Sequence, residues 1–223
     1  SLPDGIELLP LEASGCVNYQ GVVWYRKHFT LDSSLKNKKL FLHFEAIMGK
    51  SKVYLNGQLV KEHLGGYLPV IVDISDHIEW GKENVVAVCA DNSDDPSYPP
   101  GKFQDVLDFT YAGGIYRDCW LIAHRNIYIT DPNFEDETAG GGLFAASENV
   151  SKLSADVSLK LHLRNSSTSA FTGNMEYDLQ TLQGKSIGKT KQKVQLSSGT
   201  SKHFESKIHI KNPDLWSPDS PTL

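Results

Sequence analysis

The nine residues KVYLNGQLV, numbered 52–60, decide the fold class of this 223-residue chain. They form two short runs rich in apolar residues, separated by the pair Asn56 and Gly57. Both residue types tolerate the positive φ angles that a type I′ turn needs at its central positions. The stretch therefore predicts a β-hairpin whose strands flank residues 56 and 57.

Similar strand patterns occur on both sides of this hairpin. They lie at residues 23–31, 40–45, 68–73, 84–90 and 119–124. Their spacing is near the roughly 8–12 residues expected in sandwiches and barrels. No window shows a sustained 3.6-residue period of helical length, and residues 72–80 have room for one helical turn at most. The first part of the chain is therefore predicted to be all-β.

Residues 91–101 interrupt this pattern with three acidic residues and three prolines. They cannot form a ladder strand, because proline lacks the backbone donor. The pattern predicts a long loop. Such loops often carry functional residues, although a solvated surface loop is the default interpretation.

The composition changes after about residue 128. Residues 131–149 contain Gly140-Gly141-Gly142 and several acids, which is typical of a linker or a mobile edge. Alternating strand patterns then return at residues 156–163, 174–179, 193–196 and 204–210. These predict a small two-sheet sandwich that is polar on one side of each strand. The predicted domains are residues 1–127 and 128–223, with a linker around residues 131–150.

Composition excludes several classes of protein. There are 22 Lys and Arg against 27 Asp and Glu, a formal charge of −5, and no basic block of the kind that nucleic-acid binders need. No stretch approaches the roughly 18 apolar residues of a membrane span. Cys16, Cys89 and Cys119 are far apart and are expected to be buried and unpaired. The eight histidines lack metal-ligand spacing, so no metal site is expected in this chain.

A series of motifs follows in order along the chain. The motifs are Trp24-Tyr25-Arg26-Lys27, Phe44-Glu45, Val53-Tyr54-Leu55-Asn56-Gly57, Gly65-Gly66-Tyr67-Leu68-Pro69, Asp91-Asn92 and Gly113-Gly114-Ile115-Tyr116-Arg117-Asp118. Together they closely resemble the N-terminal sugar-binding domain of glycoside hydrolase family 2, the family of β-galactosidases, β-glucuronidases and β-mannosidases. The second half resembles that family's immunoglobulin-like domain, whose usual ending is similar to residues 215–223.

The resemblance implies an all-β fold, with a jelly-roll sandwich followed by an immunoglobulin-like sandwich. In the family a (β/α)₈ barrel with the active site comes next, and this chain does not contain one. Retaining glycosidases need two carboxylates about 5–5.5 Å apart, and no segment here alternates strands with helices of 10–15 residues. We therefore expect the non-catalytic N-terminal part of a retaining glycosidase, most like a β-galactosidase, which hydrolyses nothing by itself.

The resemblance also implies the partners of such a part. It would support the barrel of the parent chain and complete one wall of the pocket for a carbohydrate, most like a β-galactoside. Family members are often oligomeric, which implies a homo-oligomer. No cofactor is expected in this chain, whereas Na⁺ and Mg²⁺ are implied for the full-length parent.

Asp108 and Asn18 are the first candidates for sugar contact. Asp108 stands before residues 109–115 at a spacing similar to that of a family aspartate that contacts sugar hydroxyls and a sodium ion. A carboxylate suits both tasks, and a solvated loop aspartate is the alternative. Asn18 stands shortly before the Tyr25 strand, where some family members bring an asparagine to the sugar. A turn-forming asparagine is the alternative.

Further candidates lie in the loop and beside it. Asp91 and Asn92 end a strand and either line the pocket or cap the loop. The aromatic candidates for stacking on a sugar ring are Trp24, Tyr67, Tyr98, Phe109 and Tyr111. Tyr98 and Tyr111 stand in loop context and are the better candidates, whereas Trp24 is expected in the core.

Arg117 is expected to be a structural anchor. A buried guanidinium would need a carboxylate partner, and Asp118 and Glu45 are the candidates.

Two other functions fit the same residues. A stand-alone carbohydrate-binding module shares the jelly-roll fold, so the fold does not decide. A structural or oligomerisation module would use the second half for contacts between subunits. We expect a bacterial-type soluble protein of the cytoplasm or the periplasm. No signal peptide is visible in the sequence, and unpaired cysteines are compatible with the cytoplasm.

Overall fold

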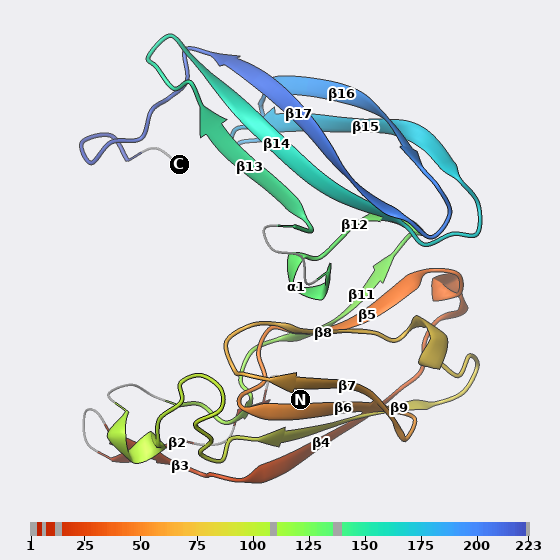
Figure 1. Cartoon of the computed structure of the whole chain (residues 1–223), viewed down its shortest axis with the longest axis vertical. Helices are drawn as coiled ribbons and strands as arrows, with labels where there is room; N and C mark the ends of the chain where they lie inside the picture. The colour runs from red at the N-terminus through yellow and green to blue at the C-terminus, as the bar shows by residue number, and fades with distance from the viewer. Residues whose placement is uncertain (1–3, 6–7, 12–14, 108–110, 136–139, 222–223) are drawn as a thin grey trace. The chain divides into compact units, whose positions relative to one another are not determined.

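The computed structural model describes residues 4–5, 8–11, 15–107, 111–135 and 140–221, with side chains from Tyr19 onward. The fold is all-β, as predicted, and the chain divides into two compact units, Ser1–Arg125 and Asn126–Leu223 (Figure 1). The division lies two residues before the predicted domain boundary at 127/128.

Unit 1 is a sandwich of two antiparallel sheets (Figure 1). The four-stranded sheet has the order β4 (Val22–Phe29), β9 (Asn84–Asp91), β6 (Lys50–Leu55) and β7 (Gln58–Leu64). The three-stranded sheet has the order β11 (Cys119–His124), β5 (Lys39–Phe44) and β8 (Val70–Asp73). Two short pairs join β1 (Asp4–Gly5) to β10 (Gly114–Ile115) and β2 (Leu8–Leu11) to β3 (Gly15–Asn18). Single turns of 3₁₀ helix occur at η1 (Ser33–Leu35), η2 (Ser75–His77) and η3 (Gln104–Val106).

The core of unit 1 lies between its two sheets. Its buried members are Leu40, Leu42, Phe44, Ile47, Val53, Leu55, Val70, Val72, Ile74, Ile78, Val86, Val88, Ala90 and Ile115. Alternate residues of β9 point inward, so Val86, Val88 and Ala90 are buried while their neighbours are only half-buried. Burial of one large aliphatic side chain contributes about 1.5–3 kcal/mol, so this cluster is the main source of the unit's stability.

The predicted hairpin is confirmed and is tied to a neighbouring strand. Asn56 and Gly57 have φ angles of 50° and 82°, as a type I′ turn requires. The Asn56 side chain donates to Asn84 Oδ1 at 2.8 Å and accepts from the Val85 backbone N–H at 2.9 Å. The turn therefore also anchors the beginning of β9.

Unit 2 contains a long central strand and a separate two-stranded sheet (Figure 1). The strand β14 (Ser154–Asn165) pairs with β12 (Ile127–Ile129), β13 (Leu143–Glu148) and β17 (Ser201–Lys211). The other sheet pairs β15 (Phe171–Gln180) with β16 (Ser186–Leu196). The buried core consists of Leu161, Leu163, Val194, Leu196 and Phe204.

The stretch predicted as a linker around residues 131–150 is folded where the structure describes it. It holds the short helix α1 (Pro132–Glu135) and the edge strand β13, which pairs with β14 at six positions. Gly141 has a φ of +73°, and a Cβ there would lie 2.6 Å from Pro132 Cα. The glycines thus permit a close backbone contact inside unit 2, which is why a glycine-rich composition was misleading. In the part of the chain that is described, no helix is long and apolar enough to span a membrane.

Candidate functional site

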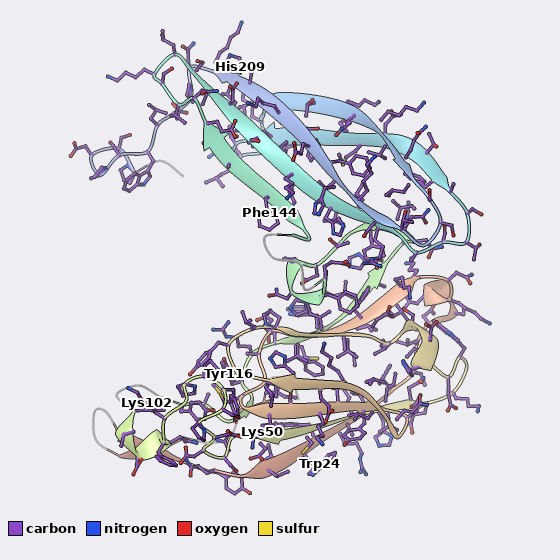
Figure 2. The ribbon with its side chains drawn as sticks, in the orientation of Figure 1. Trp24, Lys50, Lys102, Tyr116, Phe144 and His209 are labelled. Atoms are coloured by element: carbon purple, nitrogen blue, oxygen red, sulfur yellow. The ribbon has the colours of Figure 1, made fainter. Side chains whose placement is uncertain are left out.

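Three chain segments meet at the end of unit 1 where β9 runs into the loop of residues 92–107. The backbone N–H of Gly65 donates to Gly49 O at 3.0 Å, and that of Met48 donates to Gly114 O at 2.9 Å. A Cβ at Gly49 would lie 2.0 Å from Asp91 O, so only glycine permits this approach. Figure 2 shows the labelled residues Lys50, Tyr116 and Lys102 at this end, which we call the loop end.

Asp91 and Asn92 both use their side chains to hold the chain itself. Asp91 Oδ1 accepts from the backbone N–H of Ser93 at 3.0 Å and from its hydroxyl at 2.6 Å. Asn92 is only 1% exposed; it accepts from Gly21 N–H at 3.0 Å and donates to Tyr19 O at 2.8 Å. These bonds close the loop before β4 onto the end of β9, and they support the capping interpretation of both residues.

The loop after β9 is held by further bonds from its acids. The Lys50 ammonium lies 2.7 Å from Asp95 Oδ2, and the Ser97 backbone N–H donates to Asp95 Oδ1 at 2.8 Å. The hydrogen bond from Lys50, with those from Ser97, holds the pKa of Asp95 far below its usual range. Asp94 Oδ1 accepts from the Gln104 backbone N–H at 3.0 Å. The sequence did not predict the Lys50–Asp95 pair, because no local pattern indicates a contact between two residues so far apart in the chain.

Among the described residues near this loop, Tyr67, Tyr98, Tyr111 and Tyr116 differ in how far their rings are exposed. Tyr98 and Tyr111 are buried, at 6% and 5% exposed, so neither offers a free face for stacking on a ligand, contrary to the expectation from their loop context. Burial raises the pKa of Tyr111, and the neighbouring Tyr98 raises it further. Tyr116 donates to Gly66 O, whereas Tyr67 is 45% exposed. Tyr67 is therefore the tyrosine of this group that is best placed to meet a ligand.

The two first candidates for sugar contact lie at the limits of what the structure describes. Asp108 falls outside the described residues, so its fit to a sodium ion stays a prediction. Asn18 is the last residue of β3, opposite Leu8, and its side chain is not described. Among the residues with described positions, no group of three or more His, Cys, Asp or Glu is arranged to hold a metal ion.

Two sequence expectations on structural residues are wrong. Trp24 was expected in the core but is 61% exposed, because its position on β4 points away from the facing sheet. Arg117 is exposed and lies over the Tyr116 ring, 5.6 Å from its centroid, and among the described residues it has no carboxylate partner. Glu45, one of its expected partners, instead accepts from Trp120 Nε1 at 2.9 Å.

A separate pocket of about 580 Å³ opens between the edge strands β4 and β11. Its lining includes Tyr25, Phe29, Leu31, Leu42, Phe44, Val86, Val88, Cys119 and Trp120. Most of these side chains belong to the core or pack against it. Burial raises the pKa of the Cys119 thiol to about 11, so it is not a nucleophile near neutral pH. The pocket is an extension of the core and lacks catalytic groups.

Several described carboxyl groups have displaced pKa values. A glycosidase general acid needs a raised pKa. The acids with clearly displaced pKa values are Asp32, Asp73, Asp95, Asp156 and Asp178, and hydrogen bonds lower the pKa of every one. None of these five acids therefore has the raised pKa of a glycosidase general acid.

Comparison with known proteins agrees with this division into two units. Residues 7–125 match the family described as "Glycosyl hydrolases family 2, sugar binding domain", and residues 143–223 match "Glycosyl hydrolases family 2". A β-galactosidase from Thermoanaerobacter pseudethanolicus is 39% identical over 135 residues, which are 60% of this chain and 18% of that protein. A β-glucuronidase from Formosa agariphila is 30% identical over 203 residues, which are 89% of this chain and 20% of that protein.

The structural comparison gives the same result. The crystal structure of a β-glucuronidase from Bacteroides uniformis superposes with a TM-score of 0.80 and 30% sequence identity, covering 92% of this chain and 24% of that one. The chain thus spans about a fifth of the length of these relatives. The matches extend through both β-sandwich units, and the chain therefore belongs to glycosyl hydrolase family 2.

Proposed function

We propose that this chain is the non-catalytic N-terminal part of a retaining glycosidase of family 2, most like a β-galactosidase. In this proposal unit 1 is the family's jelly-roll domain, and its loop end forms one wall of the sugar pocket. Unit 2 is the immunoglobulin-like domain, and both units support a catalytic barrel in the parent protein. The observation that carries the proposal is that both units match the family while the chain spans only about a fifth of the length of these glycosidases.

The substrate class follows from the relatives. The relatives include both β-galactosidases and β-glucuronidases, so the proposal commits to a β-linked sugar and favours a galactoside on the 39% identical relative. The hydrogen-bonded loop supports a positioning role, because Asp91, Asn92 and Asp95 all fix the backbone that leads to Asp108.

Hydrolysis by this chain alone is the first test. The purified chain is incubated with nitrophenyl β-galactoside, β-glucuronide and β-mannoside, and no release of nitrophenol is expected. Turnover that co-purifies with the chain through further columns would contradict the proposal, because the carboxylate pair would then lie within these sandwiches.

The role of the loop end is tested in the full-length parent. We expect Asp108→Asn to raise KM for the β-galactoside or lower kcat/KM by about tenfold or more, because a charged hydrogen bond to a sugar hydroxyl is worth about 1.5–3 kcal/mol. Asp105→Asn is the matched control, since Asp105 is an exposed acid of the same loop. Equal kinetics for both variants would remove Asp108 from the pocket.

A further inference from the structure

The outer face of the four-stranded sheet in unit 1 carries an aromatic pair in which Trp24 is exposed and Tyr54 is half-buried. Trp24 on β4 and Tyr54 on β6 have ring centroids 5.7 Å apart and planes tilted by 35°. They belong to strands that do not pair with each other, because β9 runs between them. The rings meet over β9 because its outward residues at this level, Ala87 and Cys89, are small.

Hydrogen-bonding groups surround these two rings. The register places Trp24, Cys89, Lys52 and Glu62 in one row across the sheet. Lys52 Nζ lies 3.0 Å from Glu62 Oε1, and both side chains are more than half exposed.

The adjacent row brings a third charged group to the same face. Arg26 on β4 lies opposite Ala87, which lies opposite Tyr54 on β6. Arg26 is exposed. The Trp24 and Tyr54 rings are therefore bordered by the N–H donors of Arg26 and by the Lys52–Glu62 ion pair, which supplies both donors and acceptors. Figure 2 shows Trp24 on the outer side of β4, at a different part of the unit from Tyr116 and Lys102.

The size of this surface argues against a protein partner. An aromatic side chain buries about 150–250 Å² when fully covered, so the exposed Trp24 and the half-buried Tyr54 together offer less than about 500 Å². The register adds one exposed aliphatic side chain, Leu59, opposite Tyr54. A stable protein interface needs about 800 Å² from each side, with few charges at its centre. Here an ion pair lies in the same row as Trp24, where an interface core would exclude it.

The charges argue for a neutral ligand. The ion pair cancels internally and leaves one guanidinium, which is too little for an anionic polymer or lipid surface. A pyranose ring combines an apolar C–H face with hydroxyls around its edge that both donate and accept. An aromatic pair bordered by Arg, Lys and Glu presents the complementary arrangement.

We propose that this face binds a neutral β-linked saccharide, with one pyranose ring stacked on Trp24 and Tyr54. Arg26, Lys52 and Glu62 would hydrogen-bond its hydroxyls. The site goes beyond the proposed function, because its residues lie on the sheet face and not in the loop end. It requires no chemistry, only binding by the chain as it stands.

Native gel electrophoresis with soluble β-galactan, xyloglucan or β-mannan in the gel tests this proposal. We expect at least one of the three polysaccharides to retard the chain. Trp24→Ala should weaken the retardation constant about tenfold, which corresponds to about 1.4 kcal/mol, because the stacking surface of the indole is lost. Trp24→Tyr should keep most of the retardation.

Trp120→Ala is the matched control and should bind like the unchanged chain. Trp120 is 53% exposed, close to the 61% of Trp24, but it lies on the other sheet and its indole N–H is bonded to Glu45. Circular dichroism of each variant checks that the fold is kept. The Lys52→Gln and Glu62→Gln variants test the hydrogen-bonding groups beside the Trp24 and Tyr54 rings without changing the rings.

Three results would overturn the proposal. The first is no retardation by any of the three polysaccharides, and the second is equal retardation of the Trp24→Ala variant and the unchanged chain. The third is a dimer in solution that Trp24→Ala converts to a monomer, which would make this face a protein contact. The hydrolysis and Asp108 experiments do not depend on Trp24, so failure here is distinguishable from failure of the proposed function.

Discussion

Replacement of Asn92 by alanine separates a structural role from a ligand-binding role at the loop end. In the structure the Asn92 carboxamide is 1% exposed and links Gly21 N–H to Tyr19 O. Removing it leaves one donor and one acceptor of the neighbouring loop without their partner. The prediction is a loss of stability in unit 1.

The expected size of this loss follows from the two bonds. An unsatisfied, fully buried polar group costs about 1–3 kcal/mol. Tyr19 is 52% exposed and Gly21 is half-buried, so water replaces part of each lost bond. We therefore expect about 2 kcal/mol for Asn92→Ala. For a unit of this size that corresponds to a fall in Tm of roughly 6–10 °C.

Tryptophan fluorescence during thermal or urea unfolding measures this effect selectively. Trp24, Trp80 and Trp120 lie in unit 1, whereas Trp216 lies in unit 2, so the signal reports mainly on the affected unit. Asn92→Asp is the matched control. It keeps an acceptor for Gly21 N–H but places a buried carboxylate oxygen against the Tyr19 carbonyl oxygen, so its loss should be at least as large as that of Asn92→Ala.

A small effect would refute this reasoning. If Asn92→Ala shifts the midpoint by less than about 2 °C and at the same time weakens substrate binding in the full-length parent, the carboxamide serves the ligand. If Asn92→Asp is as stable as the unchanged chain, the bond to the Tyr19 carbonyl contributes nothing and the two-bond explanation is wrong.

Two further predictions concern the backbone and the pH dependence of unit 1. Gly49→Ala should prevent proper folding, because φ is +87° and the new Cβ would lie 2.0 Å from the Asp91 carbonyl oxygen. Gly57→Ala is the control: φ is +82° but nothing lies within 4 Å, so this variant should lose only about 1 kcal/mol of stability. Soluble yield and Tm distinguish the two variants. Burial raises the pKa of Asp73, but hydrogen bonds from Ser75 and Lys39 outweigh it and the net pKa is lowered. The stabilisation by the charged Asp73 is therefore fully present above the unfolded-state pKa of about 3.9. It is lost as the pH falls through the lower pKa of the folded state. Asp73→Asn removes this contribution, so the fall in Tm below about pH 4 should be less steep in this variant. An unchanged acid profile in Asp73→Asn would contradict this.

Local patterns predicted most of the strands. The runs at residues 84–90 and 119–124 became β9 and β11, because alternation of apolar residues is a property of the chain itself. The Asn56-Gly57 turn was equally local, since two adjacent φ angles decide it. The linker around residues 131–150 was misjudged because glycine has two uses: it loosens a chain, and it also permits the close contact that Gly141 makes with Pro132.

The exposure of individual side chains, and so their access to a ligand, could not be predicted from local patterns. Tyr98 and Tyr111 stand in a loop-like sequence but are buried, and Trp24 stands in an apolar strand but is exposed. Loop context describes the backbone, whereas exposure depends on what packs against each residue from distant parts of the chain. The outward position of Trp24 became informative only when β9 placed it beside Tyr54.

The sequence by itself determined the all-β class, the position of most strands and the relationship to family 2 glycosidases, because each depends on order and periodicity along the chain. The tertiary structure alone decided how the polar residues are used. In the folded chain Asn92 hydrogen-bonds to Tyr19 and Gly21, and Lys50 pairs with Asp95. Trp24 lies exposed beside the half-buried Tyr54 on the outer face of a sheet. The physical reason is that hydrogen bonds and burial are set by distances in space, and strand pairing brings together residues that the sequence keeps tens of positions apart.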